Sequence, residues 1–363
     1  MQVGIVGLPN AGKSTLFNAL TKAGAQSAAY AFTTIEPNIG MVDVPDPRLY
    51  KIAELEGSAK ITPASVKFLD IAGLVRGASK GEGLGNQFLH NIRETDAIAH
   101  IVRCFDDQNV CHVEGRVAPG EDIDIINLEL MMADLATVEK RLAAAAKTLR
   151  AGDKDAAREV ATLEKARDHL DKGLTLRSHD FDDKETAYLK SLSLLTLKPV
   201  IYVANIGENA IGEDGNPYVK EVEEKAAEEK AVVVVLPAEL EEEMSQLADE
   251  EAAEFMRDMG IEESPLDAFI HASYKLLKLI TFFTGGPTEA RAWTVVKGTK
   301  APEAAGKIHT DMERGFIRAE IVSFEDLEKF GSFNAVKESG NLRLEGKEYV
   351  IRNGDVVYFR FAV

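Results

Sequence analysis

The stretch Gly7-Leu8-Pro9-Asn10-Ala11-Gly12-Lys13-Ser14-Thr15 decides the fold of this chain. It matches the pattern G-x-x-x-x-G-K-[ST], in which glycines let the backbone curl around phosphate oxygens. An apolar strand, Gln2–Val6, precedes the stretch, and an amphipathic helix is expected over residues 13–23. Because the pattern lies between a strand and a helix, as this chemistry requires, we interpret it as a phosphate-binding loop.

The residue types in this loop have separate predicted tasks. Successive backbone N–H groups face the phosphates, and the N-terminus of the following helix adds partial positive charge. Lys13 is predicted to reach the β- and γ-phosphates and to act in catalysis, and the Ser14 hydroxyl to coordinate Mg²⁺. The nucleotide-binding residues predicted in the loop are Asn10, Ala11, Gly12, Lys13, Ser14 and Thr15.

Two later segments are predicted to complete the magnesium and γ-phosphate site. Asp70 closes an apolar strand expected over residues 65–71, where its carboxylate can bind Mg²⁺ through water. Gly73 can donate its backbone N–H to the γ-phosphate. In Phe32-Thr33-Thr34-Ile35-Glu36-Pro37-Asn38, one threonine can close onto the metal, and we choose Thr34 over Thr33. The predicted metal ligands are Ser14, Thr34 and Asp70.

Adenine is the predicted base. GTPases commonly read guanine with N-K-x-D after a later strand, but here the strand over residues 199–205 ends in Asn205-Ile206-Gly207-Glu208. Glu208 is one methylene longer than Asp, so its paired acceptors would lie elsewhere. The Asn205 amide could bond the adenine 6-amino group and N7; the alternative is that Asn205 only caps a loop.

Hydrolysis is expected to be slow. Leu74 follows Gly73 where many GTPases have a Gln that orients the attacking water, and Leu cannot do this. A K⁺ ion held by Asn10 beside the phosphates could compensate charge in the transition state. His112 could instead position or deprotonate the water, although a lone histidine is more often structural.

The remaining pattern predicts a doubly wound α/β domain with an insertion. Short β-branched runs without polar alternation are typical of parallel strands covered on both faces; they span residues 2–6, 65–71, 97–105, 199–205 and 232–236. Apolar residues spaced by three and four run from Leu128 to Leu149, and a second such series runs from Ala156 to Leu174. These series predict an antiparallel coiled-coil arm; the alternative is that both helices only pack on the sheet.

The chain is accordingly expected to have three parts. The nucleotide-binding domain takes residues 1–127 and 197–280, the helical insertion 128–196, and a compact β-rich module 281–363. A helix is expected over residues 266–280, and the acidic runs Glu241-Glu242-Glu243 and Glu250-Glu251 are interpreted as solvated helix faces.

Charge and composition limit the partners and the compartment. The net charge of −18 repels nucleic acids and anionic membranes, so specific DNA binding is not expected. Residues 281–363 hold 12 basic and 12 acidic side chains, which leaves room there for a ribosome or RNA contact. Two cysteines, no signal peptide and no apolar run long enough for a membrane span predict a cytoplasmic protein without a membrane partner.

Together, these motifs resemble the YchF family, the Obg-like ATPases within the Obg branch of P-loop GTPases, over essentially the whole chain. The segments that carry the resemblance are Asn10–Thr15, Phe32–Asn38, Asp70–Leu74, Gly77–Asn86, Asn205 with Glu208, Arg291–Thr294 and His309–Asp311. The segment Pro237-Ala238-Glu239 departs from it, being more acidic than the loop expected to close over the base.

The resemblance implies a P-loop core, an inserted coiled-coil arm and a C-terminal TGS domain with a β-grasp fold. It also implies ATP preference, weak ATPase activity, and association with the ribosome (70S or large subunit) and ribosomal RNA, in translation or stress regulation. His112 occupies the position where the family is proposed to have a catalytic histidine. Two alternatives stay open: a GTPase, and an ATP-gated ribosome- or RNA-binding module with incidental hydrolysis.

Overall fold

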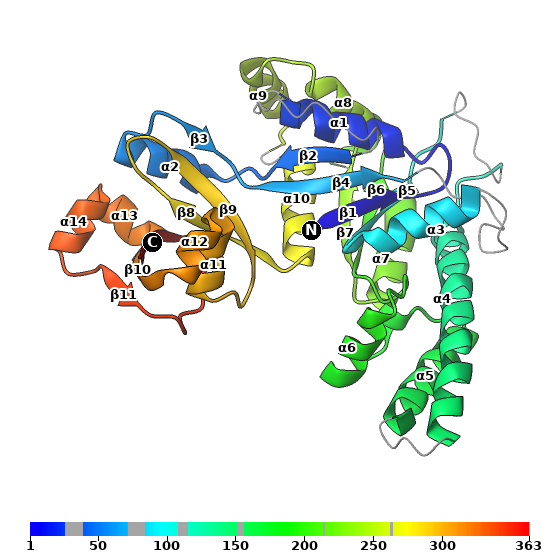
Figure 1. The fold of residues 1–363 in the computed structure, drawn as a ribbon. Helices are drawn as coiled ribbons and strands as arrows, with labels where there is room; N and C mark the ends of the chain where they lie inside the picture. Colours follow the sequence, from blue (N-terminus) through cyan, green and yellow to red (C-terminus); the bar gives the residue numbers. More distant parts are fainter. Residues whose placement is uncertain are drawn as a thin grey trace. The chain divides into compact units, whose positions relative to one another are not determined.

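The computed structural model describes residues 1–25, 39–71, 84–107, 115–150, 156–212, 215–261 and 264–362. They form two compact units, which Figure 1 shows as a ribbon. The first comprises residues 1–41 and 67–273, and the second residues 42–66 and 274–363. The early segment 42–66 thus joins the C-terminal unit, a grouping for which the sequence offered no signal.

A six-stranded sheet with the order β2-β4-β1-β5-β6-β7 forms the centre of the first unit. The pairs β1–β4, β1–β5, β5–β6 and β6–β7 are parallel. The strands are β1 Gln2–Val6, β2 Ile39–Asp43, β4 Ser65–Asp70, β5 Ala97–Arg103, β6 Val200–Asn205 and β7 Val232–Leu236. Every residue of β5 and β6 is buried, so the prediction of parallel strands covered on both faces is confirmed for these two central strands, whereas β4 has one exposed residue and β7, at the edge of the sheet, has two.

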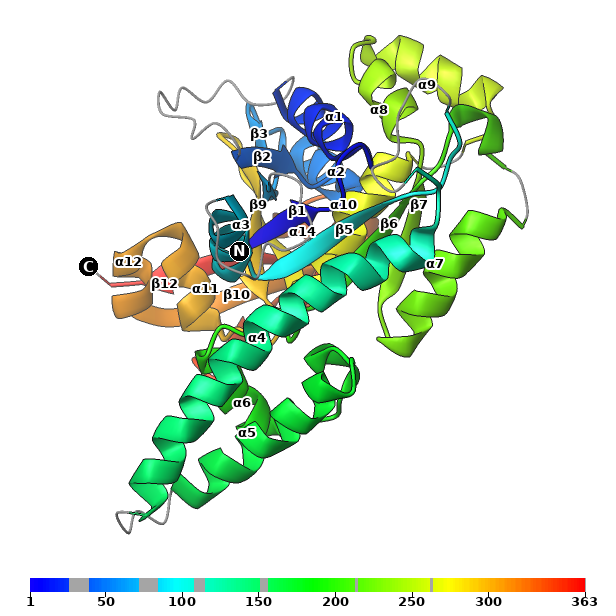
Figure 2. The same cartoon turned by 90° about the vertical axis from the view of Figure 1, so that its right-hand side faces the viewer.

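Helices cover both faces of this sheet (Figures 1 and 2). On one face, α3, α4 and α7 share a core with β5 and β6, whereas α1 and α8 pack together on the other face. The helices that flank the sheet are α1 Lys13–Ala25, α3 Leu84–Glu94, α7 Pro217–Glu228, α8 Ala238–Met244, α9 Asp249–Asp258 and α10 Pro265–Leu276, with the 3₁₀ turn η3 Glu208–Ala210.

The predicted helical arm is present, and its first helix belongs to two cores. Helix α4, Pro119–Arg150, packs its first half on the sheet through residues such as Ile126 and Leu130. Its second half pairs with α5, Ala156–Asp171, and projects away from the sheet (Figure 2). The arm core is completed by η2 Leu176–Ser178 and α6 Asp183–Ser191.

The apolar seam predicted for the arm is buried in its middle and open at its ends. Val138 and Leu163 are fully buried, whereas Leu128 and Leu174, at the root of the arm, are 53% and 45% exposed. Ala166 occupies the interior position beside Arg167, which explains how the seam tolerates a charged neighbour. The predicted turn at Gly152-Asp153 lies outside the described residues.

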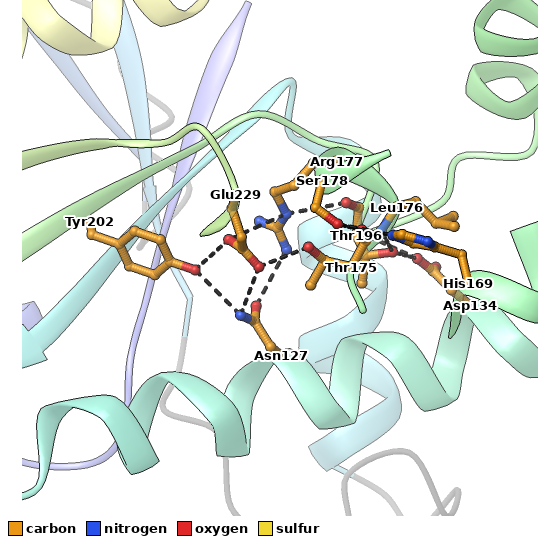
Figure 3. A network of polar contacts seen from close by, with 10 residues as sticks. All are labelled: Asn127, Asp134, His169, Thr175, Leu176, Arg177, Ser178, Thr196, Tyr202 and Glu229. Atoms are coloured by element: carbon orange, nitrogen blue, oxygen red, sulfur yellow. Dashed lines mark hydrogen bonds and ion pairs between the residues drawn. The ribbon is translucent and has the colours of Figure 1, made fainter. Parts of the chain in front are cut away.

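A buried polar network fixes the root of the arm to the sheet (Figure 3). Glu229 lies at its centre, accepting hydrogen bonds from the Tyr202 hydroxyl (2.6 Å) and from Asn127 Nδ2 (3.1 Å). Arg177 Nε lies 3.8 Å from a Glu229 oxygen and donates to the Thr196 carbonyl at 3.1 Å. Strand β6, helix α4 and the turn after α5 are therefore held by one set of contacts.

The second unit is a mixed six-stranded sheet, in the order β11-β10-β12-β8-β9-β3. Strand β12 runs parallel to β8 and antiparallel to β10, and β8 is antiparallel to β9. Its elements are α2 Pro47–Glu56, β3 Ile61–Thr62, β8 Leu279–Thr284, β9 Ala290–Val296, α11 Ala301–Ile308, α12 Thr310–Arg314, β10 Phe316–Ser323, α13 Phe324–Phe330, α14 Phe333–Glu338, β11 Arg343–Glu345 and β12 Asp355–Phe361.

One expected helix proved too long. The helix predicted over residues 266–280 ends at Leu276, and the chain then turns at Lys278, whose φ of 54° is left-handed, into strand β8. The run Ile280-Thr281-Phe282-Phe283 is rich in β-branched and aromatic residues, which fit a buried strand as well as the end of a helix. Because this run pairs with β9 and β12, it forms a strand and not the end of the helix.

None of the helices in the described parts of the chain combines the length and the apolar character that a membrane span requires.

Candidate nucleotide-binding site

The predicted phosphate loop joins β1 to α1 at the carboxyl edge of the parallel sheet. Both glycines of the pattern stand where a side chain would collide. A Cβ on Gly7 would lie 2.6 Å from the Ile101 carbonyl oxygen, and one on Gly12 would lie 2.2 Å from Asn205 Nδ2. Gly12 also has a φ of +98°, which L-residues rarely adopt. The loop can therefore curl only with glycine at these positions.

Lys13 lies inside this curl. Lys13 is only 8% exposed, and its Nζ donates a hydrogen bond to the Leu8 carbonyl oxygen at 2.7 Å. Burial lowers the pKa of Lys13 to about 8, and the Asp70 carboxylate opposes part of that shift. The ammonium is thus held at the centre of the loop by a contact that a phosphate oxygen can replace.

Asp70 ends β4, the strand next to β1 in the sheet. Burial raises the pKa of its carboxyl group, and the charge on Lys13 acts in the opposite direction. Ser14 is exposed in the first turn of α1. The structure therefore brings three predicted site residues, Lys13, Ser14 and Asp70, to one edge of the sheet.

The donors present fit Mg²⁺ bound together with phosphate. No group of three or more His, Cys, Asp or Glu side chains that could hold a metal occurs within the described ranges. Mg²⁺ does not need such a cage, because it keeps several waters and is usually held by one or two protein oxygens plus substrate phosphates. One hydroxyl, Ser14, and one carboxylate, Asp70, are this kind of donor set.

Asn205 connects the phosphate loop to the far side of the site. Its Nδ2 donates to the Ala11 carbonyl oxygen at 3.0 Å, and its Oδ1 accepts from the Ala238 N–H at 2.9 Å. The residue is 4% exposed, at the end of β6. One N–H and one lone pair of the amide take no part in these two bonds, so contact with the adenine base stays a prediction.

Glu208 begins the 3₁₀ turn that follows β6, and it is exposed. It lies three residues after Asn205 at the same edge of the sheet, where a base bound beyond the loop would be found. Four other residues in the predicted site lie outside the described residues: Thr34, Gly73, Leu74 and His112. Their roles also stay predictions, as does the K⁺ contact of Asn10, a residue whose φ of 63° is left-handed.

Sequence reasoning missed Glu241, and its interpretation as part of a solvated helix face is wrong. Glu241 is 3% exposed, and its carboxylate accepts a hydrogen bond from the Leu266 N–H (3.3 Å) at the start of α10. Burial raises its pKa to about 7. The available signal was its spacing of three residues from Ala238 and from Met244, which are both buried on the same face of α8.

A glycine-bounded loop around a buried lysine, with a carboxylate at the end of the adjacent parallel strand, defines the class of P-loop nucleotide-binding proteins.

Comparisons with known proteins narrow this class. Residues 2–140 match the family described as 50S ribosome-binding GTPase, and residues 279–362 match the YchF-GTPase C-terminal family, described as a protein of unknown function. Several curated relatives carry the name ribosome-binding ATPase YchF. The one from Escherichia coli O157:H7 is 53% identical over 99% of both chains, and the one from Bacillus subtilis (strain 168) is 52% identical over 100% of both.

A solved structure, that of the Schizosaccharomyces pombe YchF GTPase, is 39% identical and superposes with a TM-score of 0.90, covering 99% of this chain and 97% of that one. The chain belongs to the YchF family. The resemblance and the predicted fold are therefore confirmed: a P-loop sheet, a long helical insertion and a C-terminal TGS-like domain with a mixed sheet.

Proposed function

We propose that this chain is a Mg²⁺-dependent ATPase with slow intrinsic hydrolysis, whose bound nucleotide controls its association with ribosomes. The observation that carries the proposal is the buried Lys13 ammonium, held at the Leu8 carbonyl in the centre of the loop. The relatives that are 52–53% identical over the full length and are named ribosome-binding ATPases support the choice of ATP and of the ribosome. The proposed setting is translation or stress regulation in the cytoplasm.

The protein's own groups bind and orient the triphosphate. On binding, Lys13 exchanges the Leu8 carbonyl for β- and γ-phosphate oxygens, which favour its charged form. The backbone N–H groups at the start of α1 face the same oxygens. Mg²⁺, when bound, neutralises charge on the phosphates; Ser14, Asp70 and Thr34 are the residues proposed to hold it.

Slow turnover follows from the residue type at position 74. Leu74 cannot orient an attacking water, so hydrolysis needs another group. The proposed ones are His112, as the residue that positions the water, and K⁺ held by Asn10. Such an enzyme suits a switch, in which the bound nucleotide matters more than the amount hydrolysed.

The GTPase alternative rests on three names that contain the word GTPase, those of the fission yeast protein and of the two families matched by residues 2–140 and 279–362. The relative affinity of the chain for ATP and GTP decides between the ATPase and the GTPase. We would measure the binding of both nucleotides by calorimetry with Mg²⁺ for the native chain and for Glu208→Asp. The proposal expects ATP to bind at least about tenfold more tightly to the native chain, a difference of about 1.4 kcal/mol, and Glu208→Asp to reduce this preference. Tighter GTP binding by the native chain would establish the GTPase instead.

The second alternative is a ribosome- or RNA-binding module in which ATP only gates docking and hydrolysis is incidental. Cosedimentation with 70S ribosomes and with large subunits, compared between ATP, ADP and a non-hydrolysable ATP analogue, separates it from the switch. The ATPase switch predicts release after hydrolysis in the ATP sample. Lys13→Ala is expected to abolish the dependence of ribosome binding on the nucleotide. If this variant still docks in a nucleotide-dependent way, Lys13 does not have the proposed phosphate-binding role.

A further inference from the structure

A groove of about 400 Å³ lies at the root of the helical arm, between α4, α7 and the segment Gly173–Ser178. We call it the arm-root groove and define it by Asp124, Leu128, Leu174, Lys225, Glu228 and Glu229. All of these residues belong to the first unit of the chain. None of them has a task in the nucleotide site described above.

The walls of the groove include two leucines in unusual positions. Leu128 and Leu174 belong to the two apolar series of the arm, yet they are 53% and 45% exposed, whereas Val138 and Leu163 in the same series are fully buried. The coiled coil therefore extends its apolar stripe past the point where its helices cover each other. Covering both leucines would remove apolar surface from water, which favours binding.

The charge of the arm-root groove is negative. Its lining includes three carboxylates, on Asp124, Glu228 and Glu229, against one ammonium, and Glu229 is itself paired with Arg177, whose Nε lies 3.8 Å away. That ammonium, Lys225, donates to both Asp124 carboxylate oxygens at 2.8 and 2.9 Å. Helix α7 as a whole has four glutamates and two lysines. Such a surface repels a phosphate backbone and attracts Lys and Arg side chains.

One of these carboxylates is held in place before any partner arrives. Glu229 accepts hydrogen bonds from the Thr175 and Tyr202 hydroxyls at 2.7 and 2.6 Å, and Asn127 donates to it as well (Figure 3). Asn127 and Thr175 also line the groove. Because the polar wall is already ordered, a bound segment does not have to immobilise it, which lowers the entropic cost of association.

We propose that the arm-root groove binds a segment of a protein partner that combines Lys or Arg side chains with a leucine-like apolar side chain. The inference rests on the proposed function and deepens it, because it assigns this contact with the ribosome to a basic protein segment and not to ribosomal RNA. Leu128 and Leu174 receive the apolar side chain, and the exposed carboxylate of Glu228 receives the cation.

Cosedimentation with purified 70S ribosomes tests the groove. Glu228→Lys and Leu128→Ser are each expected to weaken ribosome affinity roughly tenfold, the size typical of a lost interface anchor, with ATP affinity unchanged. Glu139→Lys and Leu149→Ser, an exposed glutamate and a leucine near the distal end of α4, are the matched controls. Equal binding by both groove variants, or an equal loss in the controls, would overturn the proposal.

A photo-crosslinking amino acid in place of Leu128 identifies what fills the groove. The proposal expects a crosslinked product on the ribosome that protease removes and nuclease leaves intact. A product removed by nuclease means that RNA fills the groove, and tighter ribosome binding by Glu228→Lys points the same way; either result overturns the proposal. Failure of the native chain to cosediment in any nucleotide state is a different result, because it contradicts the proposed ribosome association itself.

Discussion

The side-chain amide of Asn205 bridges Ala11 in the phosphate loop and Ala238 at the start of α8, with hydrogen bonds of 3.0 and 2.9 Å. Ala11 is 194 positions and Ala238 is 33 positions away from Asn205 in the sequence, and this one buried side chain holds both. The bridge sets the shape of the loop before nucleotide binds. Its partners are backbone groups, so the identity of Ala11 and Ala238 gives no hint of it.

Replacing Asn205 with Ala is expected to weaken ATP and GTP binding alike. The change leaves a buried carbonyl and a buried N–H without partners, and each such group costs about 1–3 kcal/mol. A loss of at least about tenfold in affinity for both nucleotides should be seen by calorimetry. A loss confined to ATP would show instead that Asn205 acts mainly on the base.

Gly12→Ala is expected to abolish measurable nucleotide binding. Its Cβ would collide with the Asn205 amide at a φ of +98°. Gly57→Ala is the matched control, since Gly57 also has a positive φ, of +63°, but has nothing within 4 Å of the added Cβ. The control should lose some thermal stability and keep its ATP affinity. Normal ATP binding by Gly12→Ala would contradict the loop geometry.

Glu241 predicts a pH dependence of stability. Its pKa is raised from 4.5 to about 7 in the folded chain, so the folded state binds more protons between these values. The free energy of unfolding therefore falls as pH rises through this window, by roughly 3 kcal/mol from this group. Thermal unfolding of Glu241→Gln should show a smaller decline between pH 5 and pH 8 than the native chain shows. Identical pH profiles would refute the assignment.

Arg177→Met is expected to destabilise the root of the arm by about 3–5 kcal/mol, because it leaves the buried Glu229 carboxylate without its cation. The side chains of this pair are only 6% and 9% exposed. In the double variant Arg177→Met/Glu229→Gln the loss should be smaller than the sum of the two single losses. Denaturant unfolding of all four chains gives the coupling energy, and strictly additive losses would mean that the two groups do not interact.

Local patterns in the sequence were sufficient for the phosphate loop, the central parallel strands and the arm. The loop pattern predicts a backbone shape, and the arm follows from a repeat of three and four residues carried over many turns. What the sequence did not disclose depends on contacts between distant segments. Residues 42–66 join the second unit through pairing of β3 with β9, and the run after Leu276 becomes a strand because two other strands receive it.

The position of a predicted site residue followed from the sequence wherever its residue type has one characteristic use in such a loop, whereas its role stays a prediction. Lys13 and Asp70 are such cases, and both lie at the edge of the sheet where the pattern puts them. Glu241 was assigned to a solvated face because a run of glutamates on a short helix is typical of one. Its burial depends on α10, whose Leu266 N–H donates to its carboxylate. The bridging role of Asn205 was hidden for a similar reason, since Ala238 begins a helix of its own.

Helix α4 continues without a break through 32 residues, from the core beneath the sheet to the far end of the arm. At 1.5 Å per residue it is a rod about 48 Å long, clamped at one end. A force applied at the distal end, where α4 pairs with α5, would be carried along this rod to Ile126 and Leu130, which pack in the same core as residues of β6. Work done on the tip would thus be delivered to the strand that ends in Asn205.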